Sequence, residues 1–161
     1  MIPDRATLAA LFEGAPRFLD RVVAAGPFDD DAALFAAARS IAHAMPEEEQ
    51  IELVDAHPRL GAPPGTVSAM SYREQGYDRA PGSATADAGG RLDVASELER
   101  LNDAYEARQG FRYCVFVAGR SREELLPGMA AALDADRTSE LHRALDAVVD
   151  IAIDRHAKLS P

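Results

Sequence analysis

Apolar residues recur every three or four positions along most of this 161-residue chain, and this spacing constrains its fold more than any other feature. The clearest example is residues 93–109, where Val94, Leu98, Leu101 and Tyr105 fall on one face of a helix. Much of the apolar content is Ala and Leu, which are strong helix formers. The spacing and the composition together predict an all-α chain.

Residues that start and stop helices divide the first third of the chain into short segments. Proline suits the first turn of a helix, acidic residues favour its N-terminus, and a Gly-Pro pair ends it. A helix that runs towards Pro58 should end near His57, because a residue before proline disfavours helical geometry. The other signals in this region are Pro16, Gly26-Pro27, Asp29–Asp31, and Pro46 followed by Glu47–Glu49.

Two S-x-x-E patterns and a long apolar stripe predict the helices of the second half. Ser71 with Glu74, and Ser121 with Glu124, have the spacing of a capping box. Pro127 can interrupt or kink the second of these helices. A last helix is expected from about Ser139 into the 150s, and its candidate core positions are Leu141, Leu145, Val148, Val149, Ala152 and Ile153.

Two segments do not follow the helical spacing. Residues 76–91 are rich in Gly, Ala, Pro and Ser, which predicts a flexible surface excursion. Residues 111–119 form the one β-like run, and a lone run cannot make a sheet, so a buried connector is expected there. The prediction is a single domain over residues 1–161, built as a bundle of roughly eight helices with irregular loops.

The formal charge of −10 argues against nucleic acid and anionic membranes as partners. The single cysteine, Cys114, cannot form an internal disulfide, and its apolar neighbours favour a buried thiol. The first residues lack the basic head and apolar stretch of a signal peptide, and no apolar run is long enough for a membrane span. A cytoplasmic location is therefore expected.

His57 is the histidine best placed for chemistry, because it lies where a helix meets a proline-rich loop. An imidazole can donate or accept a proton near neutral pH, although a histidine at a helix C-terminus can also simply complement the dipole. His43, His142 and His156 are better explained as satisfied or surface groups. No ligand spacing for a metal and no glycine fingerprint for a phosphate or dinucleotide is present, so no cofactor is expected.

A second polar cluster contains Ser71, Glu74 and Gln75. A carboxylate with an amide can recognise ureido or imide groups, but the same residues also fit a capping box with an exposed glutamine. Arg155 could bind a carboxylate through two hydrogen bonds, or be an ordinary cation in a last helical turn. The residues alone do not separate these alternatives.

Four segments, in order along most of the chain, are similar to the OHCU decarboxylase family. His57-Pro58-Arg59-Leu60-Gly61 resembles its H-P-x-L-G loop, and residues 71–75 (SYREQ) resemble its S-x-x-E-Q. Residues 101–126 resemble its L-N-x-x-Y-x-x-x-F-G-F-P-F segment and the apolar run that follows. Residues 151–159 resemble its closing helix. This chain has Gln109, Arg112 and Tyr113 where the family usually has Phe, Pro and Phe.

The resemblance implies a helical fold, often a homodimer, that converts 2-oxo-4-hydroxy-4-carboxy-5-ureidoimidazoline to (S)-allantoin and carbon dioxide. It implies that His57 is the catalytic acid or base and that Arg155 binds polar groups of this small-molecule substrate. The residues expected to line the substrate are Pro58, Ser71, Tyr72, Arg73, Glu74 and Gln75, with the backbone of Tyr113, Cys114, Val115, Phe116 and Val117.

Two other functions stay open at this point. The substitutions at residues 109–113 are compatible with a helical binding or regulatory module that lacks the activity. A related enzyme could also act on another ureido substrate.

The decarboxylation itself needs no cofactor, because the substrate's C=N bond can accept the electrons that carbon dioxide leaves behind.

Overall fold

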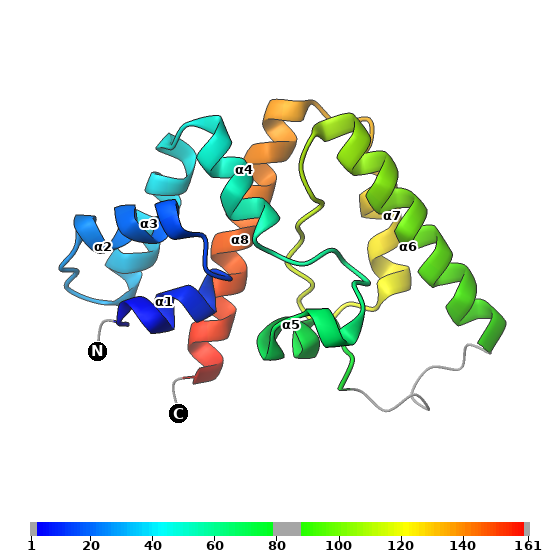
Figure 1. Ribbon diagram of the computed structural model, residues 1–161, viewed down its shortest axis with the longest axis horizontal. Coiled ribbons are helices and arrows are strands. Elements are labelled where there is room, and N and C mark those ends of the chain that lie inside the picture. The colour runs from blue at the N-terminus through cyan, green and yellow to red at the C-terminus, as the bar shows by residue number, and fades with distance from the viewer. Residues whose placement is uncertain (1–2, 79–87, 160–161) are drawn as a thin grey trace. The chain divides into compact units, whose positions relative to one another are not determined.

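The computed structural model describes residues 3–78 and 88–159, and within these ranges the chain is all-α, as predicted (Figure 1). The described residues form eight α-helices and one short 3-10 helix, without a strand. The α-helices are α1 (Arg5–Leu11), α2 (Pro16–Ala25), α3 (Asp31–Ala44), α4 (Glu47–Asp55), α5 (Ala69–Glu74), α6 (Ala88–Gln109), α7 (Arg122–Ala132) and α8 (Arg137–Leu159); the 3-10 helix is η1 (Pro64–Thr66).

The chain divides into two compact units, each with its own core. The first unit combines the residues up to His57 with residues 114–116 and the chain from Thr138 onward, and so contains α1 to α4 and nearly all of α8. The second contains Pro58–Tyr113 and Val117–Arg137, and so holds α5, α6 and α7.

In the first unit, α2 packs against α1, α3 and α4. The aromatic rings of Phe12 and Phe18 meet edge to face with centroids 4.9 Å apart, and both side chains are fully buried. Five of the six core positions predicted on α8 are buried, but Ile153 is wrong, since it is 40% exposed. The reason is helical geometry: Ile153 lies about 100° around the helix axis from the buried Ala152, beyond the edge of the apolar stripe.

The local signals in the first unit act as predicted. Pro16 occupies the first turn of α2 and Gly26 follows its last residue. The side chain of Asp30 accepts a hydrogen bond from the N–H of Ala33 at 2.7 Å and so caps α3. Helix α4 ends at Asp55, two residues before His57.

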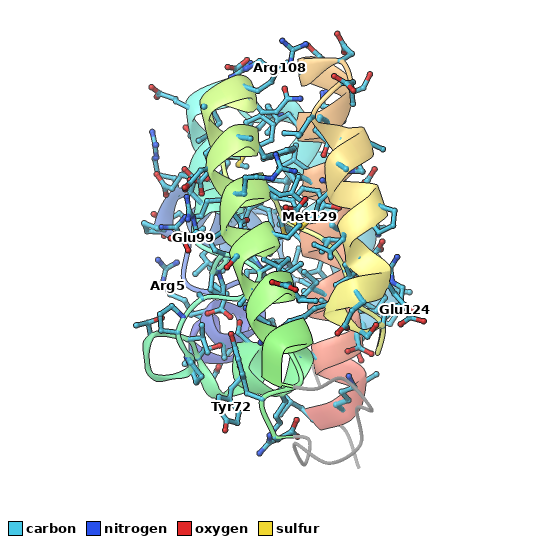
Figure 2. All side chains as sticks on the ribbon, turned by 90° about the vertical axis from the view of Figure 1, so that its right-hand side faces the viewer. Arg5, Tyr72, Glu99, Arg108, Glu124 and Met129 are labelled. Atoms are coloured by element: carbon cyan, nitrogen blue, oxygen red, sulfur yellow. The ribbon has the colours of Figure 1, made fainter. Side chains whose placement is uncertain are left out.

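In the second unit, α6 and α7 lie side by side (Figure 2). Met129 of α7 is almost fully buried, and the ring of Tyr105 on α6 meets the rings of Phe111 and Tyr113 edge to face. The connector that carries these last two residues is irregular rather than a strand, as expected.

Two local predictions in the second unit need correction. Helix α5 is capped by the side chain of Ser68 and not by Ser71, which lies inside the helix and is buried. The predicted excursion over 76–91 is wrong at its end, because α6 already begins at Ala88. Residues 79–87 of that segment lie outside the described residues.

Of two further helix signals in the second unit, the capping box is confirmed and the interruption at Pro127 is not found. Ser121 and Glu124 form a complete capping box at the start of α7. Helix α7 then continues through Pro127 without interruption. Among the described helices, none is both long enough and apolar enough to cross a membrane.

Candidate active site

His57 lies at the corner where α4 gives way to the loop that begins with Pro58. Its backbone N–H donates to the carbonyl of Val54 at 3.1 Å, and its ring Nδ1 lies 3.2 Å from the carbonyl oxygen of Leu53. A carbonyl can only accept, so this contact requires the proton on Nδ1. The neutral ring therefore carries its lone pair on Nε2, the nitrogen that can act as a base.

The surroundings of His57 keep its ring neutral. The side chain is buried, and burial is the largest cause that lowers its pKa from 6.5 to about 4. The positive charge of Arg155 lowers the pKa further, while the carboxylate of Glu13 and the Leu53 carbonyl oppose the change. At neutral pH the ring can therefore accept a proton. In the resting state the ring is therefore neutral, and its Nε2 carries a lone pair.

Arg155 is buried rather than an ordinary cation of the last helical turn. Its Nη1 donates to the carbonyls of Ala10 and Leu11, each at 3.1 Å, at the C-terminal end of α1. Its Nη2 donates to Oε1 of Glu13 at 2.8 Å. The first unit thus brings together His57, Arg155 and Glu13, and the last of these was missed by sequence reasoning. The only local signal at Glu13 was its place in a turn before Gly14, between two helices.

The five residues that follow His57 form a loop that is held by the side chain of Gln75. Oε1 of Gln75 accepts from the N–H of Gly61 at 2.7 Å, and its Nε2 donates to the carbonyl of Arg59 at 3.1 Å. The buried Asn102 of α6 adds a hydrogen bond from Nδ2 to the carbonyl of Leu60 at 2.9 Å. Pro58 is half-buried at the start of this loop. Gln75 therefore positions the loop, in addition to any contact with a substrate.

The predicted site residues over 71–75 do not all lie on the same side of helix α5. Ser71, Glu74 and Gln75 stand three and four residues apart, so they share one side of the helix axis. Ser71 is buried and Glu74 is half-buried, whereas Arg73 is exposed. The ring of Tyr72, labelled in Figure 2, packs against that of Tyr77 with centroids 5.4 Å apart. The shared face makes Ser71, Glu74 and Gln75 the better candidates for substrate contact.

The connector over 113–117 is divided between the units: Tyr113 and Val117 belong to the second, and Cys114–Phe116 to the first. Tyr113 and Cys114 are buried and Val115, Phe116 and Val117 half-buried. The carbonyl of Cys114 accepts from Nη1 of Arg143 at 2.9 Å, and Arg143 is in turn held by the buried carboxylate of Glu140. Sequence reasoning missed this Arg–Glu pair, which fixes the backbone of the connector.

The substituted positions have distinct environments. Gln109 is buried, and its Nε2 donates to the carbonyls of Ala132 and Ala135, beyond the end of α7. Arg112 is exposed and lines a cavity of about 510 Å³ in the second unit, together with Pro58, Thr66 and Glu99. The Gln109 substitution therefore has a structural explanation that does not involve a substrate.

The remaining histidines are structural or exposed, as expected. His43 pairs with Asp146 at 2.8 Å and His156 with Asp31 at 2.9 Å, while His142 is exposed. Within residues 3–78 and 88–159, no cluster of three or more His, Cys, Asp or Glu side chains could hold a metal ion.

Comparison with known proteins shows the family of this chain. The family model described as OHCU decarboxylase matches residues 4–157. The chain is 31% identical over 149 residues to the uric acid degradation bifunctional protein PucL of Bacillus subtilis (strain 168), covering 91% of this chain and 28% of that protein. It is 28% identical over 142 residues to the 2-oxo-4-hydroxy-4-carboxy-5-ureidoimidazoline decarboxylase of Haloferax volcanii, covering 88% of this chain and 80% of the relative.

Two solved structures share the fold. One is an OHCU decarboxylase crystallised in the presence of (S)-allantoin, with a TM-score of 0.73 and 22% identity, covering 98% of both chains. The other is an (S)-allantoin synthase, with a TM-score of 0.67 and 18% identity, covering 96% of this chain and 48% of that one. At these identities the structures establish the fold, and the expected resemblance is confirmed by the family model.

Proposed function

The chain belongs to the OHCU decarboxylase family, and on that premise we propose that it is a carboxy-lyase that converts 2-oxo-4-hydroxy-4-carboxy-5-ureidoimidazoline to (S)-allantoin and carbon dioxide in urate degradation. The observation that carries the proposal is the buried, neutral imidazole of His57 at the start of the H-P-R-L-G loop, with its lone pair on Nε2. The substrate has a hydroxyl proton to give up, and a neutral imidazole nitrogen has the lone pair to accept it.

The reaction replaces a carbon–carbon bond with a carbon–hydrogen bond. The bond to the carboxylate breaks, and its electron pair passes through the adjacent C=N bond to nitrogen, which takes up a proton. The hydroxyl on the same ring carbon loses its proton as it becomes a carbonyl, and the ureido-bearing carbon gains a proton from one face. The protein must therefore accept the hydroxyl proton and deliver a proton with defined stereochemistry.

His57 fits the first of these tasks. Its Nε2 would accept the hydroxyl proton, because the resting ring is neutral and keeps a lone pair on that nitrogen. The fixed contact between Nδ1 and the Leu53 carbonyl holds the ring plane, so the lone pair keeps one direction. The protonated ring can then return the proton, as a base that has become an acid.

The other predicted residues would hold the substrate. We propose that Arg155 binds its carboxylate, that Pro58, Ser71, Tyr72, Arg73, Glu74 and Gln75 line its ring and ureido group, and that the backbone of Tyr113 to Val117 contacts its edges. Ser71, Glu74 and Gln75 supply both donors and acceptors, as a ureido group requires, and they share one face of α5.

The test is optical activity of the product. Freshly generated substrate decays spontaneously to racemic allantoin, so a circular dichroism signal in the allantoin region reports the enzyme directly. The wild-type chain should produce (S)-allantoin, and His57→Asn should lose stereospecific turnover while its far-ultraviolet spectrum stays helical. Unchanged turnover in His57→Asn would refute the assignment. Allantoin binding without turnover in the wild-type chain would favour a binding module instead.

We also propose that the chain is a single domain, a homodimer and a cytoplasmic protein, without a nucleic-acid or membrane partner. The net charge of −10 supports the last point. One cooperative unfolding transition across both units, and a dimeric mass in solution, are the expected results.

A further inference from the structure

Glu13 is a charged group near His57 that the proposed function has not used. It stands in the turn between α1 and α2, and its side chain is only 13% exposed. Its backbone has a φ of 56°, the left-handed region that non-glycine residues rarely adopt. A glutamate in this conformation is maintained only where its surroundings hold it there.

One contact that holds Glu13 is with Arg155. Oε1 of Glu13 accepts from Nη2 of Arg155 at 2.8 Å, although the two residues are 142 positions apart in sequence. The side chain of Arg155 is only 2% exposed, so water cannot screen its charge effectively. A buried guanidinium without a counter-charge would be costly, and the Glu13 carboxylate supplies that charge.

The same guanidinium acts on His57. The positive charge of Arg155 disfavours a protonated ring, and the negative charge of Glu13 favours it. Both groups belong to the first unit, with Glu13 in the α1–α2 turn, Arg155 on α8 and His57 after α4. The charges of both groups therefore influence the ring of His57 from within this unit.

We propose that Glu13 is a positioning residue that fixes the Arg155 guanidinium and neutralises it beside His57, so that the ring remains basic enough to take a proton from the substrate. This inference rests on the proposed function and assigns a further residue to it. Hydrogen bonds to the Ala10 and Leu11 carbonyls fix one end of the guanidinium, and Glu13 fixes the other.

The neutralisation also matters for the substrate. A bare cation would bind the substrate carboxylate tightly before reaction, but that carboxylate loses its charge as carbon dioxide forms. Binding that weakens towards the transition state lowers KM without raising kcat. An arginine that is already paired with Glu13 binds the substrate carboxylate less tightly before the reaction and can still orient it.

Glu13→Gln is the sharpest test, because the amide keeps the size and the oxygen acceptor but removes the charge. We expect kcat to fall about tenfold or more, since general-base catalysis contributes on the order of 100-fold or more, and KM to stay constant or fall. Glu13→Asp keeps the charge with a shorter reach and should recover part of kcat. The matched control is Glu49→Gln, because Glu49 is also paired with an arginine, Arg21, and its side chain is 12% exposed; kcat should not change.

Three outcomes decide between the proposals. An active wild-type chain with kcat unchanged in Glu13→Gln overturns the inference and leaves the proposed function standing. A rise in KM without a fall in kcat overturns it as well, because it would indicate a role in binding alone. A wild-type chain without stereospecific turnover overturns the proposed function and this inference with it. If Glu13→Gln does not fold, Glu13→Asp decides, and kcat equal to wild type in that variant counts against a positioning role.

Discussion

The burial of a neutral His57 predicts that this side chain makes the folded chain less stable as the pH falls. In the unfolded chain an imidazole has its ordinary pKa of 6.5, whereas in the folded chain the pKa of His57 is about 4. Between these pH values the unfolded chain binds a proton at His57 and the folded chain does not. The free energy of unfolding therefore decreases as the pH is lowered. The contribution is fully present above pH 6.5 and lost as the pH falls towards 4.

The size of the effect follows from the same two values. On going from pH 7 to pH 5, His57 should lower the free energy of unfolding by about 2 kcal/mol. His57→Gln removes the titrating group and keeps a polar side chain of similar length. The wild-type chain should therefore lose about 2 kcal/mol more than the variant between these pH values.

The assay is urea unfolding followed by far-ultraviolet circular dichroism at both pH values, for wild type and His57→Gln. His142→Gln is the matched control, because His142 is exposed, and it should follow the wild type. An equal loss of stability in wild type and His57→Gln would show that the ring is not held neutral by burial. That result would also refute the proposed role of His57 as a base.

Three further predictions concern the groups that support the site. The rate of stereospecific turnover should stay nearly constant from pH 7 down to pH 5, because His57 keeps its lone pair there, and a midpoint near 6.5 in kcat/KM would contradict this. Gln75→Ala should lower the free energy of unfolding by about 1–2 kcal/mol through the loss of two hydrogen bonds to the 59–61 backbone, and reduce turnover as well; urea unfolding with a turnover assay measures both. Arg143→Met leaves the buried Glu140 without its arginine, so the free energy of unfolding should fall by about 1–3 kcal/mol, and a stability equal to wild type in thermal unfolding would argue against a structural pair.

Local sequence signals determined the helices and several of their ends. Pro16, Gly26 and the Ser121–Glu124 capping box act within one turn of the chain, and each is found in its predicted role. The same local chemistry placed His57 at the end of a helix, because Pro58 follows it. Ser71 failed as a cap because Ser68 stood three residues earlier with the same chemistry. Spacing alone does not decide which of two nearby serines caps a helix.

The properties that make His57 a base were decided by the tertiary structure. Its ring is buried, and the charge of Arg155 on α8 and the opposing charge of Glu13 act on it from two segments that lie 142 residues apart in sequence. The role of Gln75 in holding the loop, and of Gln109 beside α7, likewise depends on which carbonyls the fold brings near. Helix formation depends on neighbours along the chain, so periodicity can predict it. The electrostatic environment of a side chain depends on neighbours in space, and only the packed structure supplies those.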